Sequence, residues 1–196
     1  MLNVKQAFEF QSDDKPVPVS YKWIPLRMIF DDKIDFMHKA RLVARGHLTN
    51  PPTTLTYSSV VSRESVRLVF LIAAVNDLDI LGADIGNAYI NAMTKEKVYT
   101  TVGKEFGDRA GQTIIITRVL YGLKSSGAAW RSHLAQTLRD MNFKSSCTDP
   151  DVWMRVAYKE DGTSFYEYVL CYVDDLLCIS TDPAVILGHV ELTYQL

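Results

Sequence analysis

The sequence predicts an α+β fold, in which strands and helices alternate along the chain and the last strands form hairpins. Short β-branched and apolar runs recur throughout the 196 residues and are typical of strands. Two longer segments instead carry apolar runs or apolar residues at helical spacing. Because the final apolar runs follow one another directly, we expect antiparallel pairing there rather than a parallel sheet with crossover helices.

Composition indicates a globular protein. Apolar residues make up 47% of the chain and Gly and Pro are near average, so a sizeable core can form. No apolar run reaches the ~20 residues that span a bilayer, and no secretory signal is visible, so we expect no membrane association. The three cysteines are an odd number without zinc-like spacing, which indicates reduced intracellular thiols.

Charge is unevenly distributed, although the net charge is only −2. Four basic residues and no acid lie between Met37 and Arg63, whereas acids outnumber bases eight to two from Asp149 to Asp182. This pattern suits a protein that holds phosphates with one part and cations with the other. Charge segregation without a function is the simpler interpretation when the pattern is taken alone.

The N-terminal part is expected to contain a hairpin. Residues 1–20 are polar and predict a loosely ordered lead-in. Two extended segments, 21–30 and 38–46, flank the turn Asp31–Asp32–Lys33 and favour antiparallel pairing. Residues 47–61 are rich in Pro, Thr and Ser, which is typical of a loop.

Three helices are predicted further along. Ser62 has the character of an N-cap, with Glu64 in the first turn and an apolar run at 66–75, so we expect a well-buried helix. Residues 126–141 predict an amphipathic helix, and a third helix is expected near Pro183. The apolar positions of the second helix are Trp130, Leu134, Leu138 and Met141.

The other apolar runs predict strands, and 86–92 predicts a turn that enters a short helix. The strand segments are 77–85, 113–118, 152–157, 165–173 and 176–180.

The pair Asp174–Asp175 separates two strongly apolar runs within YEYVLCYVDDLLCIS. A two-residue hairpin loop favours Asn-Gly or Asp-Gly, and adjacent Asp residues add like-charge repulsion. A polar turn would explain an isolated pair, but the apolar flanks and the lack of a nearby Lys or Arg indicate a divalent cation as the missing partner. A tight turn on this pair would place Cys171 opposite Cys178 as reduced packing residues.

Asp84 ends a strand face that it shares with Leu78, Ile80 and Gly82. A carboxylate there needs a cation or hydrogen-bond donors, and it could simply cap the following turn. Together with Asp174 and Asp175 it supplies three carboxylates at strand ends, which suit Mg²⁺. Two such ions ~4 Å apart activate a hydroxyl nucleophile and stabilise a leaving oxygen.

Basic residues alternate with apolar ones from Lys39 to Arg45. Lys39, Arg41 and Arg45 fall on one face of a strand, with Leu42 on the other face. A cationic face backed by an apolar one is a plausible cradle for phosphates. An exposed edge strand guarded by charges is the alternative interpretation.

Several segments, in order, resemble the reverse transcriptase of Ty1/copia-type LTR retrotransposon (Pseudoviridae) polyproteins. ADIGNAY resembles polymerase motif A, LYGLKSSGAAW resembles the copia form of motif B, and YVDD matches the motif C box. The other matching segments are KARLVARG, SSVVSRESVRLVFLIAA and DPDVWM. A departure is Ala128, where copia-type sequences often carry Arg.

The resemblance implies the fingers and palm of a right-hand polymerase, with an antiparallel palm sheet and packed helices. The expected organisation is a lead-in from an upstream polyprotein at 1–20, mainly fingers at 21–76, and palm with motif A at 77–112. The motif B segment follows at 113–150, and 151–196 carries the YVDD hairpin of the palm. We expect the chain to end before the thumb.

The resemblance also implies roles for individual residues. Asp84 and Asp174 would be the principal ligands of two Mg²⁺ ions, for which Mn²⁺ can substitute, and Asp175 the third carboxylate. Tyr89 would be the aromatic gate that rejects a ribonucleotide, although a packing role would be preferred without the motif. Tyr172 and Val173 would support motif C. Nucleotide-binding positions would be Lys39, Arg41, Arg45, Asn87, Ala88, Tyr89, Tyr121, Gly122 and Lys124.

The implied partners are an RNA template, a DNA or RNA primer, dNTPs, and the remainder of the polyprotein with its thumb, ribonuclease H and integrase. Family members act in cytoplasmic virus-like particles with access to the nucleus. Two alternatives stay open: a catalytically inactive truncated remnant that binds nucleic acid, and a two-metal nuclease that uses the same carboxylates. Asn50–Thr54 is a candidate template contact.

Overall fold

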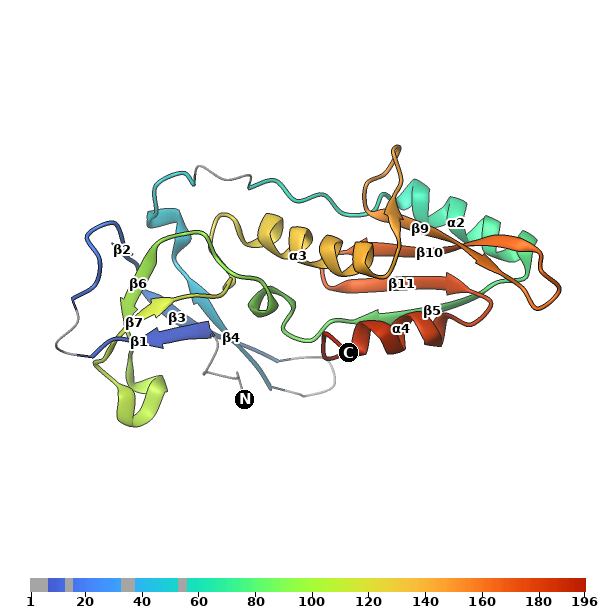
Figure 1. Ribbon diagram of the computed structural model, residues 1–196. Coiled ribbons are helices and arrows are strands. Elements are labelled where there is room, and N and C mark those ends of the chain that lie inside the picture. The colour runs from blue at the N-terminus through green and yellow to red at the C-terminus, as the bar shows by residue number, and fades with distance from the viewer. Residues whose placement is uncertain (1–6, 13–15, 33–37, 53–55) are drawn as a thin grey trace. The chain divides into compact units, whose positions relative to one another are not determined.

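The computed structural model describes residues 7–12, 16–32, 38–52 and 56–196 (Figure 1). The chain divides into two compact units. Unit 1 comprises residues 1–57 and 89–130, and unit 2 comprises residues 58–88 and 131–196. No helix in the described part of the chain is both long and apolar enough to cross a bilayer.

Unit 1 contains a four-stranded sheet in the order β1-β7-β6-β2. The strands are β1 (Phe8–Phe10), β2 (Lys22–Trp23), β6 (Val98–Thr101) and β7 (Thr113–Ile116). β2 pairs with β6 in parallel, and the other pairs are antiparallel. The prediction of a loosely ordered lead-in is therefore wrong for β1; residues 1–6 and 13–15 of that lead-in lie outside the described residues. Phe8 is only 6% exposed, because pairing with β7, more than 100 residues further along the chain, carries it into the core.

The predicted hairpin is confirmed as β3 (Leu26–Asp32) and β4 (His38–Ala44), which pair antiparallel. Asp31 and Asp32 are not in the turn, because they continue β3 opposite Lys39 and His38. The predicted turn residue Lys33 lies outside the described residues. A short 3₁₀ helix, η1 (Gly46–Leu48), follows β4.

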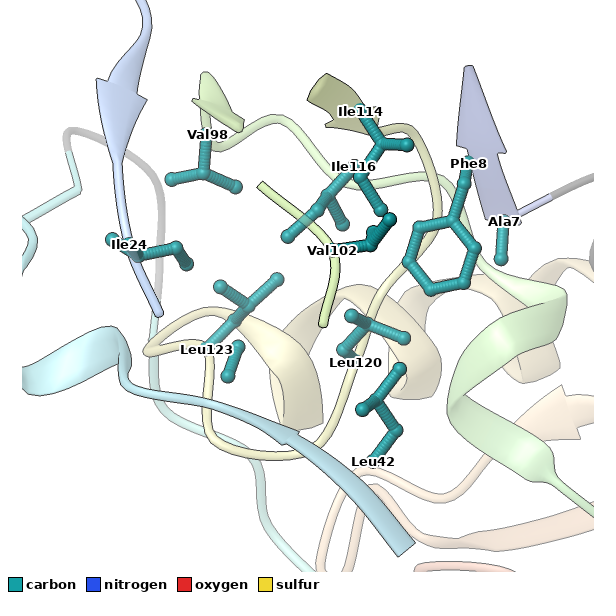
Figure 2. Packing of buried hydrophobic residues seen from close by; sticks show 11 residues of the cluster. Ala7, Phe8, Ile24, Leu42, Val98, Val102, Ile114, Ile116, Leu120 and Leu123 are labelled. Carbon is teal, nitrogen blue, oxygen red and sulfur yellow. The ribbon is translucent and has the colours of Figure 1, made fainter. Parts of the chain in front are cut away.

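Unit 1 is organised around one apolar core (Figure 2). Leu42 of β4 points into it, together with side chains from β1, β6 and β7 and from the loops after Trp23 and Ile116. Burying one such side chain stabilises the fold by about 1.5–3 kcal/mol. Of the predicted apolar face of β4, Leu42 and Ala44 are buried, whereas Ala40 is exposed.

Two glycines allow β4 to approach the segment that contains Tyr121. The Ala44 N–H donates to the Tyr121 carbonyl at 2.8 Å. Gly122 has a φ of +91°, and a Cβ atom there would lie 2.1 Å from the Ala44 oxygen. A Cβ atom on Gly46 would lie 2.2 Å from the Gly122 oxygen. Only glycine fits at either position without moving backbone.

Unit 2 contains a five-stranded antiparallel sheet in the order β5-β11-β10-β9-β8, and most of its strands run side by side in Figure 1. The strands are β5 (Asp79–Asp84), β8 (Lys144–Ser145), β9 (Val152–Tyr158), β10 (Ser164–Tyr172) and β11 (Asp175–Ser180). Among the described residues, α2 (Arg63–Asn76) and α4 (Pro183–Glu191) belong to unit 2, whereas α3 (Ser126–Asp140) begins in unit 1 and continues in unit 2. Two further 3₁₀ helices are η2 (Ala88–Asn91), at the boundary between the units in the sequence, and η3 (Lys104–Arg109) in unit 1. The α+β class is confirmed.

Helix α2 begins where the sequence predicts it. Ser62 is the N-cap, and its side chain accepts from the Ser65 N–H at 3.1 Å. Asp149 adds a second cap, because it accepts from the Ser62 N–H at 2.9 Å and from the Ser65 hydroxyl at 2.6 Å. Burial disfavours the charged form of Asp149, but these hydrogen bonds together outweigh burial and hold its pKa below the ordinary value.

The prediction that α2 is well buried is wrong. Val69 and Ala73 are buried against the sheet, whereas Leu68, Leu71 and Val75 are 58%, 61% and 76% exposed. A helix that packs on one sheet buries one stripe, so an apolar run leaves its other faces open.

The other two helices follow the predictions. In α3, Trp130, Leu134 and Leu138 are buried, and Met141 follows the helix as a half-buried residue. Asp182 caps α4 by accepting from the Ala184 N–H at 3.2 Å.

Gly122→Ala should destabilise unit 1 by at least about 2 kcal/mol, because the new methyl group meets the Ala44 carbonyl in a backbone conformation that already disfavours alanine. Gly111→Ala is the matched control, since Gly111 has a φ of +86° in the same unit and its added Cβ would meet nothing within 4 Å. Denaturant titrations compare the two variants. Equal losses would contradict the proposed close approach.

Candidate active site

The strand register places Asp84 directly opposite Asp175. β5 and β11 pair antiparallel, and these two residues form the last pair of the ladder. Tyr172 of β10 lies opposite Asp175 on its other side. Because cross-strand partners share a face, Asp84, Asp175 and Tyr172 form a row across three strands.

The hairpin that carries Asp174 turns one residue earlier than predicted. Tyr172 pairs with Asp175, so the two loop residues are Val173 and Asp174 rather than Asp174 and Asp175. The observed register pairs buried Cys171 with buried Leu176. The predicted register, which would pair Tyr172 with Leu177, differs from the observed one by two residues and keeps every side chain on the same face, so burial alone does not distinguish the two registers.

Val173 adopts a conformation that is unfavourable for its side chain. Its φ is +58°, and Asp174 is not among the residues with positive φ. Positive φ at the first loop position alone is the pattern of a type II′ turn, where glycine is normally found. A β-branched residue in this conformation carries strain on the order of 1–3 kcal/mol.

The two hairpin cysteines are not direct partners, which corrects the predicted pairing. Cys178 lies opposite Val169, and Cys171 lies opposite Leu176. Both thiols are free and buried, as expected for reduced packing residues. Burial raises the pKa of Cys171 far above its ordinary range and that of Cys178 to about 12, so both stay protonated at neutral pH.

Hydrogen bonds hold the turn after Asp84 from two sides. The Ile85 N–H donates to the Asp174 carbonyl at 2.8 Å, and the Gly86 N–H donates to the Gln195 carbonyl at 2.7 Å. Tyr194, beside Gln195, shares a 2.6 Å hydrogen bond with the Thr137 hydroxyl. The sequence offered no motif that would have revealed this C-terminal support.

Asp84, Asp174 and Asp175 bring three negative charges together without an ion-pair partner among the described residues. Burial first, and then the charges of Asp174 and Asp84, raise the pKa of Asp175. Within the described ranges, no basic side chain forms an ion pair with any of the three. The side chains, as placed among the described residues, form no group of three or more that could hold a metal ion.

A hollow of about 660 Å³ adjoins Asp84 and Asp175. Tyr172 and Arg63 also line it, together with apolar residues that include Leu170 and Leu177. Sequence reasoning placed Arg63 in the basic stretch but did not identify it as a site residue. Its position at the start of α2, directly after the Ser62 cap, was the available signal.

Most of the other predicted site residues belong to unit 1, whereas Asn87 and Ala88 belong to unit 2. The rings of Tyr89 and Tyr121 meet edge to face, with centroids 4.6 Å apart. The Lys124 amine donates to the Thr49 carbonyl at 2.5 Å, so this lysine makes a structural contact within the protein. Asn87 in unit 2 has a φ of +52° in the turn before η2, and Ala88 begins η2 and is buried.

The cationic face of β4 is partly neutralised. Arg41 forms a 3.3 Å ion pair with Asp31, whereas Lys39 and Arg45 form none with a described residue. Arg27 of β3 lies opposite Val43 and therefore joins the face of Arg41. Sequence reasoning missed Arg27, although the hairpin register would have placed it there.

Residues 5–193 match the family described as reverse transcriptase (RNA-dependent DNA polymerase), and the chain belongs to that family. Its relatives are Pol polyproteins of copia/Ty1-type retrotransposons, as the sequence resemblance predicted.

Two of these relatives come from Arabidopsis thaliana. The Retrovirus-related Pol polyprotein from transposon RE1 is 30% identical over 172 residues, which cover 86% of this chain and 11% of that protein. The polyprotein from transposon RE2 is 30% identical over 183 residues, covering 89% and 12%. The Truncated transposon Ty1-A Gag-Pol polyprotein of Saccharomyces cerevisiae is 30% identical over 156 residues, covering 79% and 12%. The chain thus spans only 11–13% of the length of such relatives.

Val173→Gly should stabilise unit 2 by roughly 1 kcal/mol, because glycine relieves the strain at positive φ. Val156→Gly is the control, since Val156 lies half-exposed within β9 and glycine should cost about 0.5–1 kcal/mol there. Thermal melts compare both with the parent chain. A similar loss in both variants would rule out strain at Val173.

Asp175→Asn should stabilise the chain by up to about 1 kcal/mol at pH 7 in chelator and low salt, because it removes repulsion opposite Asp84. The native state raises the Asp175 pKa, so the carboxylate destabilises the fold as pH rises above its unfolded pKa of ~3.9. The gain should therefore vanish near pH 3.

The matched control is Asp79→Asn, because Asp79 lies at the other end of the same ladder opposite uncharged Ser180. Melting temperatures across pH check both variants. A gain that is equal for both, or that persists at pH 3, would contradict repulsion at the Asp84–Asp175 pair.

Proposed function

We propose that this chain is the catalytic part of an RNA-directed DNA polymerase, in which a primer 3′-hydroxyl attacks the α-phosphate of a dNTP. The observation that carries the proposal is the pairing of Asp84 with Asp175 beside Asp174, in the YVDD hairpin of a reverse transcriptase family member. Chemistry of this kind depends on positioning and on electrostatic stabilisation rather than on a dedicated general base.

The three carboxylates are suited to hold two Mg²⁺ ions, or Mn²⁺ in their place. Their oxygens are hard ligands. Burial first, and then the charges of Asp174 and Asp84, raise the pKa of Asp175, and a bound cation would favour its charged form. When bound, such ions lower the pKa of the attacking hydroxyl and stabilise the departing pyrophosphate oxygen. Asp84 and Asp174 are the proposed principal ligands, and Asp175 is the third.

Other residues of the chain would bind and select the nucleotide. Lys39, Arg41 and Arg45 on and after β4 supply positive charge for the triphosphate. The Tyr89 ring, packed edge to face against Tyr121, serves as the gate against a 2′-hydroxyl. The remaining proposed contacts are the backbone amides of Asn87 and Ala88, the backbone at Gly122, and the Lys124 amine, with Tyr172 and Val173 supporting the hairpin.

In polymerase terms, the five-stranded sheet of unit 2 is the proposed palm, and the β3–β4 hairpin of unit 1 belongs to the proposed fingers. The proposed organisation along the chain is mainly fingers at 21–76, palm with motif A at 77–112, the motif B segment of fingers and palm at 113–150, and palm with the YVDD hairpin at 151–196. Proposed partners are an RNA template, a DNA or RNA primer, dNTPs, and the thumb, ribonuclease H and integrase of a Pol polyprotein. We place this assembly in cytoplasmic particles with access to the nucleus.

Asp174→Asn should reduce extension of a DNA primer on an RNA template by roughly 10²-fold or more with dNTPs and Mg²⁺, because it removes a proposed metal ligand. Asp79→Asn, in β5 of the same sheet, should leave extension unchanged. Equal extension by parent and Asp174→Asn would overturn the carboxylate assignment.

The same assay separates the rival functions. Stable, salt-sensitive binding of an RNA–DNA hybrid without extension would identify an inactive remnant. Cleavage of nucleic acid without dNTPs, abolished by Asp174→Asn, would identify a nuclease that uses the same carboxylates.

A further inference from the structure

Three exposed lysines surround a second hollow, of about 320 Å³, in unit 1. Lys22 comes from β2, and Lys95 and Lys97 come from the segment that leads into β6. The hollow also contains Asn50 and the rigid pair Pro51–Pro52. None of these lysines belongs to the motifs that identify the family.

Backbone pairing forces these lysines together. The Lys22 N–H donates to the Lys97 carbonyl at 2.9 Å, and Lys22 is the register partner of Val98 in the parallel β2–β6 pair. Lys95 and Lys97 flank Glu96 in sequence. Three like charges around one hollow repel each other, and a bound anion would offset that repulsion.

Glu96 also lines the hollow, but within the described residues its carboxylate forms no ion pair with the three lysines. Glu96 accepts from the Ser125 N–H at 2.9 Å and from its hydroxyl at 2.7 Å, and a weaker 3.4 Å contact joins it to the Thr49 hydroxyl. Its carboxylate is therefore used in joining the β6 segment to the start of α3. Across residues 7–12, 16–32, 38–52 and 56–196, no ion pair involves Lys22, Lys95 or Lys97.

We propose that this hollow binds phosphates of a single-stranded nucleic acid, as a second phosphate site apart from the β4 face. Lysine ammonium groups bind phosphates as point charges without reading sequence. A flexible single strand can bend a phosphate and its sugar into a hollow of about 320 Å³ more readily than a rigid duplex can. This inference rests on the proposed polymerase function, because the unpaired part of the template is the single strand that such an enzyme binds.

The test uses fluorescence anisotropy of a labelled single-stranded RNA at several salt concentrations, in chelator and without dNTPs. A variant with Lys22→Gln, Lys95→Gln and Lys97→Gln should bind more weakly, and its log–log salt slope should be shallower by about 2, since each lost contact to a single strand removes ~0.7. The loss should be the same for unrelated RNA sequences. An unchanged slope would overturn the proposal.

Lys104→Gln is the matched control, because Lys104 is an exposed lysine of unit 1 that does not line the hollow; it should leave the slope unchanged. A labelled dNTP analogue distinguishes the source of the phosphate. If the triple variant loses affinity for the dNTP but keeps its affinity for RNA, the hollow binds nucleotides and the template assignment is wrong.

The outcome is separable from that of the proposed polymerase function. Asp174→Asn should bind single-stranded RNA like the parent chain, since Asp174 belongs to unit 2 and lines no part of the hollow. If Asp174→Asn loses extension while the lysine variant keeps its salt slope, the polymerase proposal stands and the lysine site fails. If the slope falls while no protein extends a primer, the lysine site stands and the polymerase proposal fails.

Discussion

The register between β5 and β11 is the constraint on which the candidate site depends. It aligns Asp84 with Asp175 at one end of a ladder whose other pairs include Ile80 with Ile179 and Gly82 with Leu177. Leu177 and Ile179 pack into the core under α2, and a slip of one residue would turn them toward the opposite face. Burial of the apolar residues therefore fixes two carboxylates face to face, although their mutual repulsion opposes that arrangement.

The hairpin shows the same conflict between local and tertiary preferences. A glycine at Val173 would suit the turn better, yet the register requires the turn at Val173–Asp174. Val173 has an unfavourable backbone conformation, and the next two residues, Asp174 and Asp175, carry charges that no described ion pair neutralises. Proteins break local rules most often where function demands it, which supports this hairpin as the chemical centre.

Local signals in the sequence predicted the parts of the fold that depend on nearby residues. The Ser62 cap, the buried stripe of α3 and the apolar face of β4 follow from side-chain chemistry within a few positions. β1 could not be found this way, because its partner β7 lies more than 100 residues away and its own sequence is short. The YVDD hairpin was identified but its register was not, because two registers that differ by two residues place the same side chains on each face. Arg27 became visible only through the cross-strand pairing of β3 with β4.

The predicted site residues form two groups: some also make contacts that stabilise the fold, and others do not. Tyr121 accepts from Ala44, Gly122 leaves room for β4, and Lys124 bonds to Thr49. The Tyr121 contact uses its backbone carbonyl and survives a change of side chain. Replacing Gly122 or Lys124 disturbs these contacts, so a loss of activity at those two positions does not separate binding from stability. The carboxylates of Asp84 and Asp175 support no such contact among the described residues, and their repulsion weakens the fold. A neutral replacement should therefore trade function for stability, which is the behaviour of a residue kept for chemistry rather than for packing.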